Sequence, residues 1–214
     1  TIVVPDKDMI IAITENASGA HWAQTTLDVM WEFLERIEKH PAKAENTEKS
    51  ECLKNRMGRL ALPNPKYAPY SPIAANIEGR QWRVIDGDFY MEDVGVAQHM
   101  SGCEMPQPID VFCFHFTSDE IVMDWENREE KERLVIATDG SRRHNTLPGR
   151  LISQVLLSGA WISENTLEVK ARYIETCKEE TLLFTFEEKK LKITNSTMEF
   201  GMQKEIEILA EAED

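Results

Sequence analysis

The chain contains few of the features that mark several common functional classes. Basic residues are scarce, since 24 Lys and Arg stand against 38 Asp and Glu among 214 residues, for a net charge of -14. A chain with this charge repels polyanions, which argues against nucleic acid as a partner. No apolar run approaches the roughly 20 residues of a membrane-spanning helix, and "MIIAIT" near the start has only the length of a strand. We therefore expect neither a nucleic-acid partner nor a membrane span.

Cysteine is also sparse and has no paired spacing. The absence of a Cys-x-x-Cys pair argues against a disulfide framework or a zinc site, so we predict no metal and no cofactor. The five histidines share no metal-ligand spacing either. Cys113 in "VFCFHF" is interpreted as a small core residue, and His115 in the same run as an edge histidine satisfied by its neighbours.

The motifs of nucleophilic hydrolases are missing as well. The sequence has no Ser-x-x-Lys, no Tyr-x-Asn or Tyr-x-Ser, no Lys-Thr-Gly and no Gly-x-Ser-x-Gly. These motifs supply the nucleophile, the base and the groups around them in serine hydrolases. We therefore predict no catalytic residue, and the chain alone is not expected to be an enzyme.

Residues 1–40 carry the pattern of a hairpin and a helix. Two β-branched runs flank the turn-forming cluster 5–8 in "TIVVPDKDMIIAIT", and neither run alternates, so both faces of the hairpin are expected to be buried. A helical stripe follows, and Pro41 ends it. The members of this stripe are Leu27, Met30, Trp31, Leu34 and Ile37.

Residues 41–66 are polar and then Pro-rich, which is typical of a linker between two bodies. Within the linker we predict a short helix from about Thr47 to Met57, with Thr47 as its cap and Gly58 as its stop.

Residues 67–214 have the alternating pattern of short strands. Phe112, Phe114 and Phe116 share one face of "VFCFHFT", and "LEVKARY" places apolar residues at every second position. Some eight or more such strands predict a mainly β domain, either a closed antiparallel barrel or a sandwich. Closure is favoured because it leaves no open edge.

Four aromatic residues are the candidate ligand-binding residues of such a barrel. Trp82, Trp125 and Trp161 either ring a cavity or fill the core, because strand-period aromatics can do both. Tyr173 lies on the predicted interior face of its strand, with Leu167 and Val169.

The order of these segments resembles part of a known family. "TIVVPDKDMIIAIT" followed by "LDVMWEFL" resembles the last strand pair and C-terminal helix of serine hydrolases of the class C β-lactamase and penicillin-binding-protein type. The part from "RLALPNPKYAPYSPIAANIEGRQWRV" through "SGAWISENTLEVKARYIET" to "MEFG" resembles the lipocalin-like β-barrel domain that follows the catalytic domain in a bacterial subgroup of that family.

The resemblance implies an arrangement and a function. Residues 1–40 would be the end of a β-lactamase-like domain, residues 41–66 a linker, and residues 67–214 the lipocalin-like barrel. We expect the rest of the catalytic domain upstream of Thr1, and both a cytoplasmic and an exported location stay open. The chain would then be a non-catalytic accessory region that shapes substrate access or assembly. Its partner would be the catalytic domain of the same protein, or a second copy paired through residues 1–40. The alternative is a barrel that binds a small hydrophobic ligand.

Overall fold

The computed structural model describes residues 1–13, 22–39, 47–91, 102, 105–199 and 202–213. Its elements in chain order are β1 (Ile2–Val4), a 3-10 turn (Pro5–Lys7), β2 (Met9–Ile11), α1 (Trp22–Lys39), α2 (Thr47–Met57), α3 (Ala74–Ile77), β3 (Trp82–Asp86), β4 (Val111–Phe116), β5 (Glu120–Glu126), β6 (Lys131–Ala137), β7 (Arg143–Thr146), β8 (Gln154–Trp161), β9 (Thr166–Tyr173), β10 (Glu179–Glu187), β11 (Lys190–Glu199) and β12 (Met202–Ala212). The predicted helix at 47–57 is confirmed as α2.

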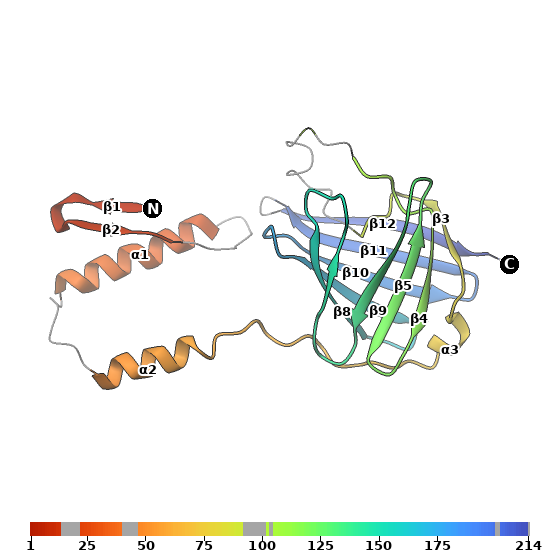
Figure 1. The fold of residues 1–214 in the computed structure, drawn as a ribbon, viewed down its shortest axis with the longest axis horizontal. Helices are drawn as coiled ribbons and strands as arrows, with labels where there is room; N and C mark the ends of the chain where they lie inside the picture. The colour runs from red at the N-terminus through yellow and green to blue at the C-terminus, as the bar shows by residue number, and fades with distance from the viewer. Residues whose placement is uncertain (14–21, 40–46, 92–101, 103–104, 200–201, 214) are drawn as a thin grey trace.

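Nine of the strands form a closed barrel, so the mainly β class and the closure are confirmed (Figure 1). The order around the ring is β6, β5, β4, β3, β12, β11, β10, β9 and β8, and β8 meets β6 again. This last pairing is parallel, at Ala137 and Ser158, and the other neighbours are antiparallel. The prediction of a purely antiparallel barrel was wrong at this seam. A ring with an odd number of strands cannot alternate direction throughout, so one parallel pair is unavoidable.

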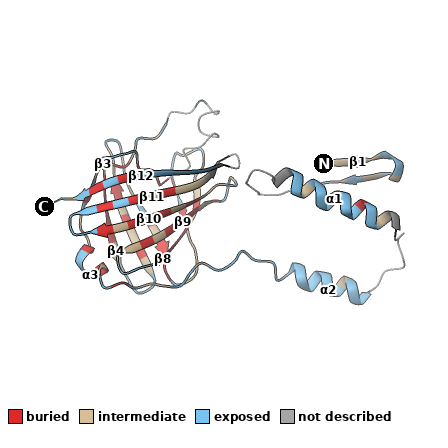
Figure 2. Ribbon diagram, turned by 180° about the vertical axis from the view of Figure 1, so that it is seen from behind, coloured by how far each residue is buried: buried red, intermediate tan, exposed pale blue. Residues whose placement is uncertain are grey.

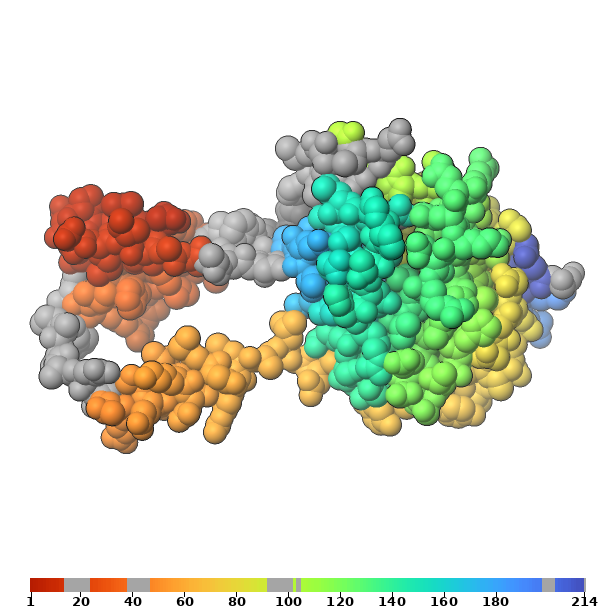
Figure 3. Space-filling view, viewed as in Figure 1, coloured from red at the N-terminus to blue at the C-terminus, as the bar shows by residue number. Residues whose placement is uncertain are grey.

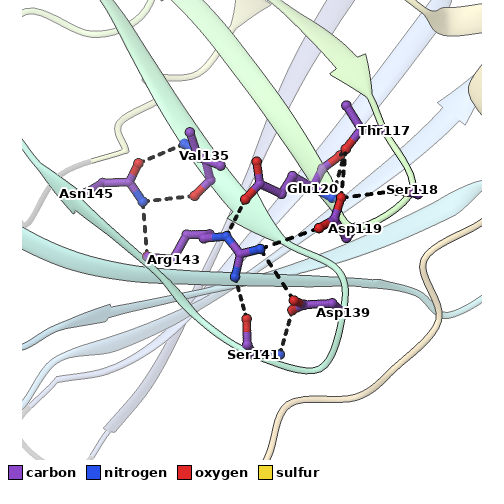
Figure 4. A network of polar contacts seen from close by, with 9 residues as sticks. All are labelled: Thr117, Ser118, Asp119, Glu120, Val135, Asp139, Ser141, Arg143 and Asn145. Atoms are coloured by element: carbon purple, nitrogen blue, oxygen red, sulfur yellow. Dashed lines mark hydrogen bonds and ion pairs between the residues drawn. The ribbon is translucent and has the colours of Figure 1, made fainter.

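Side chains reinforce this parallel seam where the backbone ladder is short. The extra strand β7 pairs with β8, and Asn145 of β7 reaches across to β6 (Figure 4). The backbone N–H of Val135 donates to Asn145 Oδ1 at 2.7 Å, and Asn145 Nδ2 donates to the Val135 carbonyl at 2.9 Å. The guanidinium of Arg143 donates to Glu120 and to Asp139 beside it. The two Asn145 hydrogen bonds satisfy backbone groups of β6 that a regular ladder would otherwise pair.

The strand alternation predicted from the sequence places the core inside the barrel (Figure 2). In β9, Leu167, Val169, Ala171 and Tyr173 are fully buried, and the charged residues between them are half-buried. One of those charged residues, Glu168, forms an ion pair at 3.1 Å with Lys66 of the segment before the barrel. The interior face of the predicted strand is therefore confirmed.

The hairpin β1–β2 and helix α1 lie outside the barrel wall (Figures 1 and 3). β1 and β2 pair antiparallel, but Val3 and Ile10 are 62% and 72% exposed. The expectation that both faces of the hairpin are buried is thus not met within the single chain, because no described element covers this face. None of the helices in the described part of the chain combines the length and apolar character needed to cross a membrane.

Candidate functional site

Aromatic rings from several strands fill the interior of the barrel. Phe114 of β4 is fully buried, and its ring centroid lies 5.2 Å from that of Phe184 and 5.7 Å from that of Phe112. Phe89 lies 5.2 Å from Phe112, again edge to face. Edge-to-face pairs at about 4.5–7 Å are a preferred geometry of packed aromatic rings. Side chains therefore occupy the space in which a hollow barrel would hold its ligand.

The four predicted ligand-binding residues are all buried, but they do not lie together. Trp82 and Trp161 both contact Phe186, at centroid distances of 5.7 and 5.9 Å. Trp125 on β5 is separated from Trp82 by β4. Tyr173 lies at the C-terminal end of β9. Trp161 is paired with Leu167, near the other end of that strand. The structure thus brings Trp82 and Trp161 together and places Tyr173 in separate surroundings.

A pocket of about 690 Å³ opens at the end of the barrel beside α3. Trp82, Phe186 and Ile77 line its apolar part, and Arg80 lies 5.8 Å from the centre of the Trp82 ring. The Trp82 indole N–H, like those of Trp125 and Trp161, has no hydrogen-bond partner in the described part of the chain, although the side chain is fully buried. A buried donor of this kind is uncommon and can be satisfied by water or by a ligand acceptor.

A second group of functional side chains lies on the outer face of the barrel. In β4, the phenylalanines point inward, so Cys113 and His115 point outward from alternate positions. Cys113 is paired across the ladder with Asp124 of β5. The sulfur of Cys113 lies 3.6 Å from His115 Nε2, which lies 3.7 Å from Asp124 Oδ2. One ligand atom from each of the three residues falls within 4.8 Å of the others.

Glu78 fixes the histidine of this cluster. Its Oε1 accepts a hydrogen bond at 2.8 Å from His115 Nδ1, and its Oε2 accepts one at 2.8 Å from the Phe116 backbone. Gly79 follows in the left-handed region, with φ of 65°, and its N–H donates to the Phe114 carbonyl. Because a carboxylate can only accept, Nδ1 donates its proton to Glu78, and this orients the ring so that Nε2 faces Cys113 and Asp124.

Arg133 of β6 holds the carboxylate of the cluster. Its Nε donates to Asp124 Oδ1 at 2.6 Å and its Nη2 to Oδ2 at 3.0 Å. This hydrogen bonding lowers the pKa of Asp124, so that side chain is ionised at neutral pH. A surface pocket of about 530 Å³ borders Cys113, His115, Asp124 and Arg133.

The cluster has the residue types of a Cys-His-Glu nucleophile triad, but the thiol is not activated. Burial raises the pKa of Cys113, and the negative charge of Asp124 raises it further. A catalytic cysteine needs the opposite, a pKa lowered by a cationic neighbour. The donor set of sulfur, imidazole and carboxylate is one that can hold a transition metal ion, whose own charge would deprotonate the coordinating thiol.

The sequence predicts separate structural roles for Cys113 and His115, and it does not predict that they form a cluster. Cys113 is buried, as predicted for a core residue, but it faces outward, and His115 is 45% exposed beside Glu78. The Cys-x-His spacing on one strand does place both on one face. Asp124 and Glu78 come from other segments, and their approach depends on strand register that no motif records.

The comparisons with known proteins give no further assignment. No family model and no curated protein matches the chain.

Proposed function

We propose that this chain is a non-catalytic accessory region of a bacterial serine hydrolase of the β-lactamase and penicillin-binding-protein type. Residues 67–214 would be its lipocalin-like barrel domain and residues 1–40 the last elements of the hydrolase domain. The observation that carries the proposal is the number of exposed large apolar side chains in the described residues 1–13 and 22–39. They are Val3, Ile10, Leu27, Val29, Trp31 and Phe33.

These apolar side chains are costly to leave in water. Burial of each such side chain contributes about 1.5–3 kcal/mol, and a two-stranded hairpin is marginal without a body to pack on. β1–β2 and α1 therefore fit elements that complete a larger sheet and cover it. In the family that the sequence resembles, the matching hairpin and helix belong to the catalytic domain, which supports that domain as the covering body.

The barrel supports an accessory role because its centre is a packed core and its sequence lacks the hydrolase motifs. A rigid, closed body next to a catalytic domain can limit which substrates reach the active site or hold subunits in an assembly. We propose this shaping of access or assembly as its role, with the chemistry performed by the hydrolase domain.

The test is the oligomeric state of the chain on its own. Without a hydrolase domain, we expect self-association through residues 1–40, measured as a concentration-dependent mass by light scattering. Ile10→Glu should make the chain monomeric because it places a charge in the apolar contact. Tyr70→Glu is the matched control, since Tyr70 is 73% exposed against 72% for Ile10, and it should leave the mass unchanged.

Two results would count against the accessory role. One is a strict monomer that Ile10→Glu does not alter, which would show that the exposed apolar side chains need no cover. The other is hydrolysis of a chromogenic β-lactam or a D-amino-acid ester by the purified 214-residue chain. The gene provides an independent check, because the reading frame upstream of Thr1 should encode Ser-x-x-Lys and Tyr-x-Asn.

The second candidate function is binding of a small apolar ligand at the barrel end beside α3. The buried Trp82 N–H without a partner favours it, because a ligand acceptor in the adjacent pocket would satisfy this donor. We expect an apolar fluorescent probe with a carbonyl group to quench tryptophan emission, and Trp82→Phe to abolish the quenching. Trp31→Phe, on the exposed face of α1, is the control. Quenching that survives Trp82→Phe would rule this site out.

A further inference from the structure

We propose that Cys113, His115 and Asp124 form a binding site for a zinc-type transition metal ion on the outer face of the barrel. The three ligands come from two neighbouring strands, β4 and β5, so a rigid ladder sets their spacing. The pocket at this site shares no lining residue with the pocket beside α3.

The distances match a single metal ion. Ligand atoms held at about 2.0–2.3 Å by one tetrahedral zinc lie about 3.3–3.6 Å apart. Cys113 Sγ and His115 Nε2 are 3.6 Å apart, and His115 Nε2 and Asp124 Oδ2 are 3.7 Å apart. The third separation, from Cys113 Sγ to the Asp124 carboxylate, is within 4.8 Å, so a metal ion also requires these two side chains to approach each other.

The surrounding contacts are those that a metal site requires. Glu78 accepts a hydrogen bond from His115 Nδ1 and so turns Nε2 toward the other two ligands, and a metal ion bound there would complete the usual carboxylate–histidine–metal arrangement. Arg133 bonds both oxygens of Asp124. An ionised carboxylate has about four lone-pair sites, so Oδ2 keeps one for the metal.

Charge and access favour a divalent ion with a preference for sulfur and nitrogen. The two negative charges of Glu78 and Asp124 exceed the single positive charge of Arg133. Thiolate and imidazole ligands select zinc, cobalt or copper over magnesium and calcium, which prefer oxygen. The surface pocket beside the cluster gives an ion access and leaves the fourth position to water.

Cobalt titration of the full chain tests the site, because Co²⁺ replaces zinc and a cobalt–thiolate bond gives a charge-transfer absorption. We expect one equivalent of Co²⁺ to produce this band, an equimolar amount of Zn²⁺ to remove it, and excess Mg²⁺ to leave it unchanged. Cys113→Ser should abolish the band, and His115→Gln and Asp124→Asn should each weaken Co²⁺ binding.

Glu78→Gln tests the positioning role, since it keeps the shape of the side chain but weakens its hold on the imidazole. We expect Co²⁺ affinity to fall about 10–100-fold while the absorption band keeps its shape. The matched controls are Cys177→Ser and His144→Gln, which change an exposed cysteine and an exposed histidine outside the site. Both should bind Co²⁺ as the unaltered chain does.

Three results would overturn the proposal. The first is a thiolate band that persists in Cys113→Ser but disappears in Cys177→Ser. The second is binding of several equivalents that Mg²⁺ displaces, as expected of a generally acidic surface. The third is unchanged affinity in His115→Gln, a half-exposed position where the fold should tolerate substitution even if Cys113→Ser does not fold. None of these results depends on whether a hydrolase domain precedes the chain.

Discussion

Replacing Phe114 by alanine should lower the free energy of unfolding by about 3–5 kcal/mol, the usual cost of removing a buried phenylalanine. Phe114 is fully buried and has ring contacts with Phe112, Phe116, Phe184 and Phe186, at centroid distances from 5.2 to 6.2 Å. The neighbouring rings come from a closed ladder of strands and cannot collapse freely into the cavity. Urea denaturation followed by far-UV circular dichroism measures the change.

The comparison with Tyr70→Ala makes this experiment specific. Tyr70 is 73% exposed, so its loss should alter stability by no more than about 0.5 kcal/mol. If Phe114→Ala costs as little as this control, the barrel centre is not a close-packed core. The candidate ligand-binding function would then be favoured over an accessory one.

The sequence predicts the strands well because burial in a barrel follows a period of two. "LEVKARY" and "VFCFHF" indicate which side chains point inward, and the structure confirms both faces. The parallel seam between β6 and β8 could not be predicted in the same way. It rests on one pairing, Ala137 with Ser158, and on the Asn145 side chain from β7. Neither contact has a periodic signal in the sequence.

The Cys113 cluster shows a second limit of sequence interpretation. Cys113 and His115 are two residues apart, and alternation alone places them on one face. Asp124 joins them because the β4–β5 ladder pairs it with Cys113. Glu78 joins them because it forms an isolated parallel β-bridge with Phe114. Register and tertiary bridges of this kind depend on the whole barrel, so local spacing cannot predict the site.

The prediction that both faces of the hairpin are buried fails for a different reason. The apolar pattern of the hairpin predicts that Val3 and Ile10 are buried, but it does not identify what would bury them. In the single chain these residues stay exposed. A sequence pattern of this kind is compatible with an interface as well as with a core, and the pattern alone does not distinguish the two.

The second large effect is expected at the end of the barrel opposite α3, where an ion pair is buried. Lys178 Nζ lies 2.8 Å from Glu180 Oε1, and the two side chains are 11% and 5% exposed. The hydroxyl of Tyr173 donates to Glu180 Oε2 at 3.2 Å, so the carboxylate has both a charged and a neutral donor. Removing one partner of such a pair leaves the other charge in a site of low polarity.

We expect Glu180→Gln to lower the free energy of unfolding by about 3–5 kcal/mol, because the amide keeps an acceptor for Tyr173 but removes the negative charge that lies 2.8 Å from the buried Lys178 ammonium. Lys178→Met/Glu180→Gln should recover most of this loss, since the double variant removes both charges and retains the hydrogen bond. Urea denaturation of the two single variants and the double variant gives the coupling between the residues. Additive losses would mean that the two charges are solvated independently and that this end of the barrel is open to water. Recovery in the double variant would instead support a barrel sealed at this end, as an accessory domain with a packed core requires.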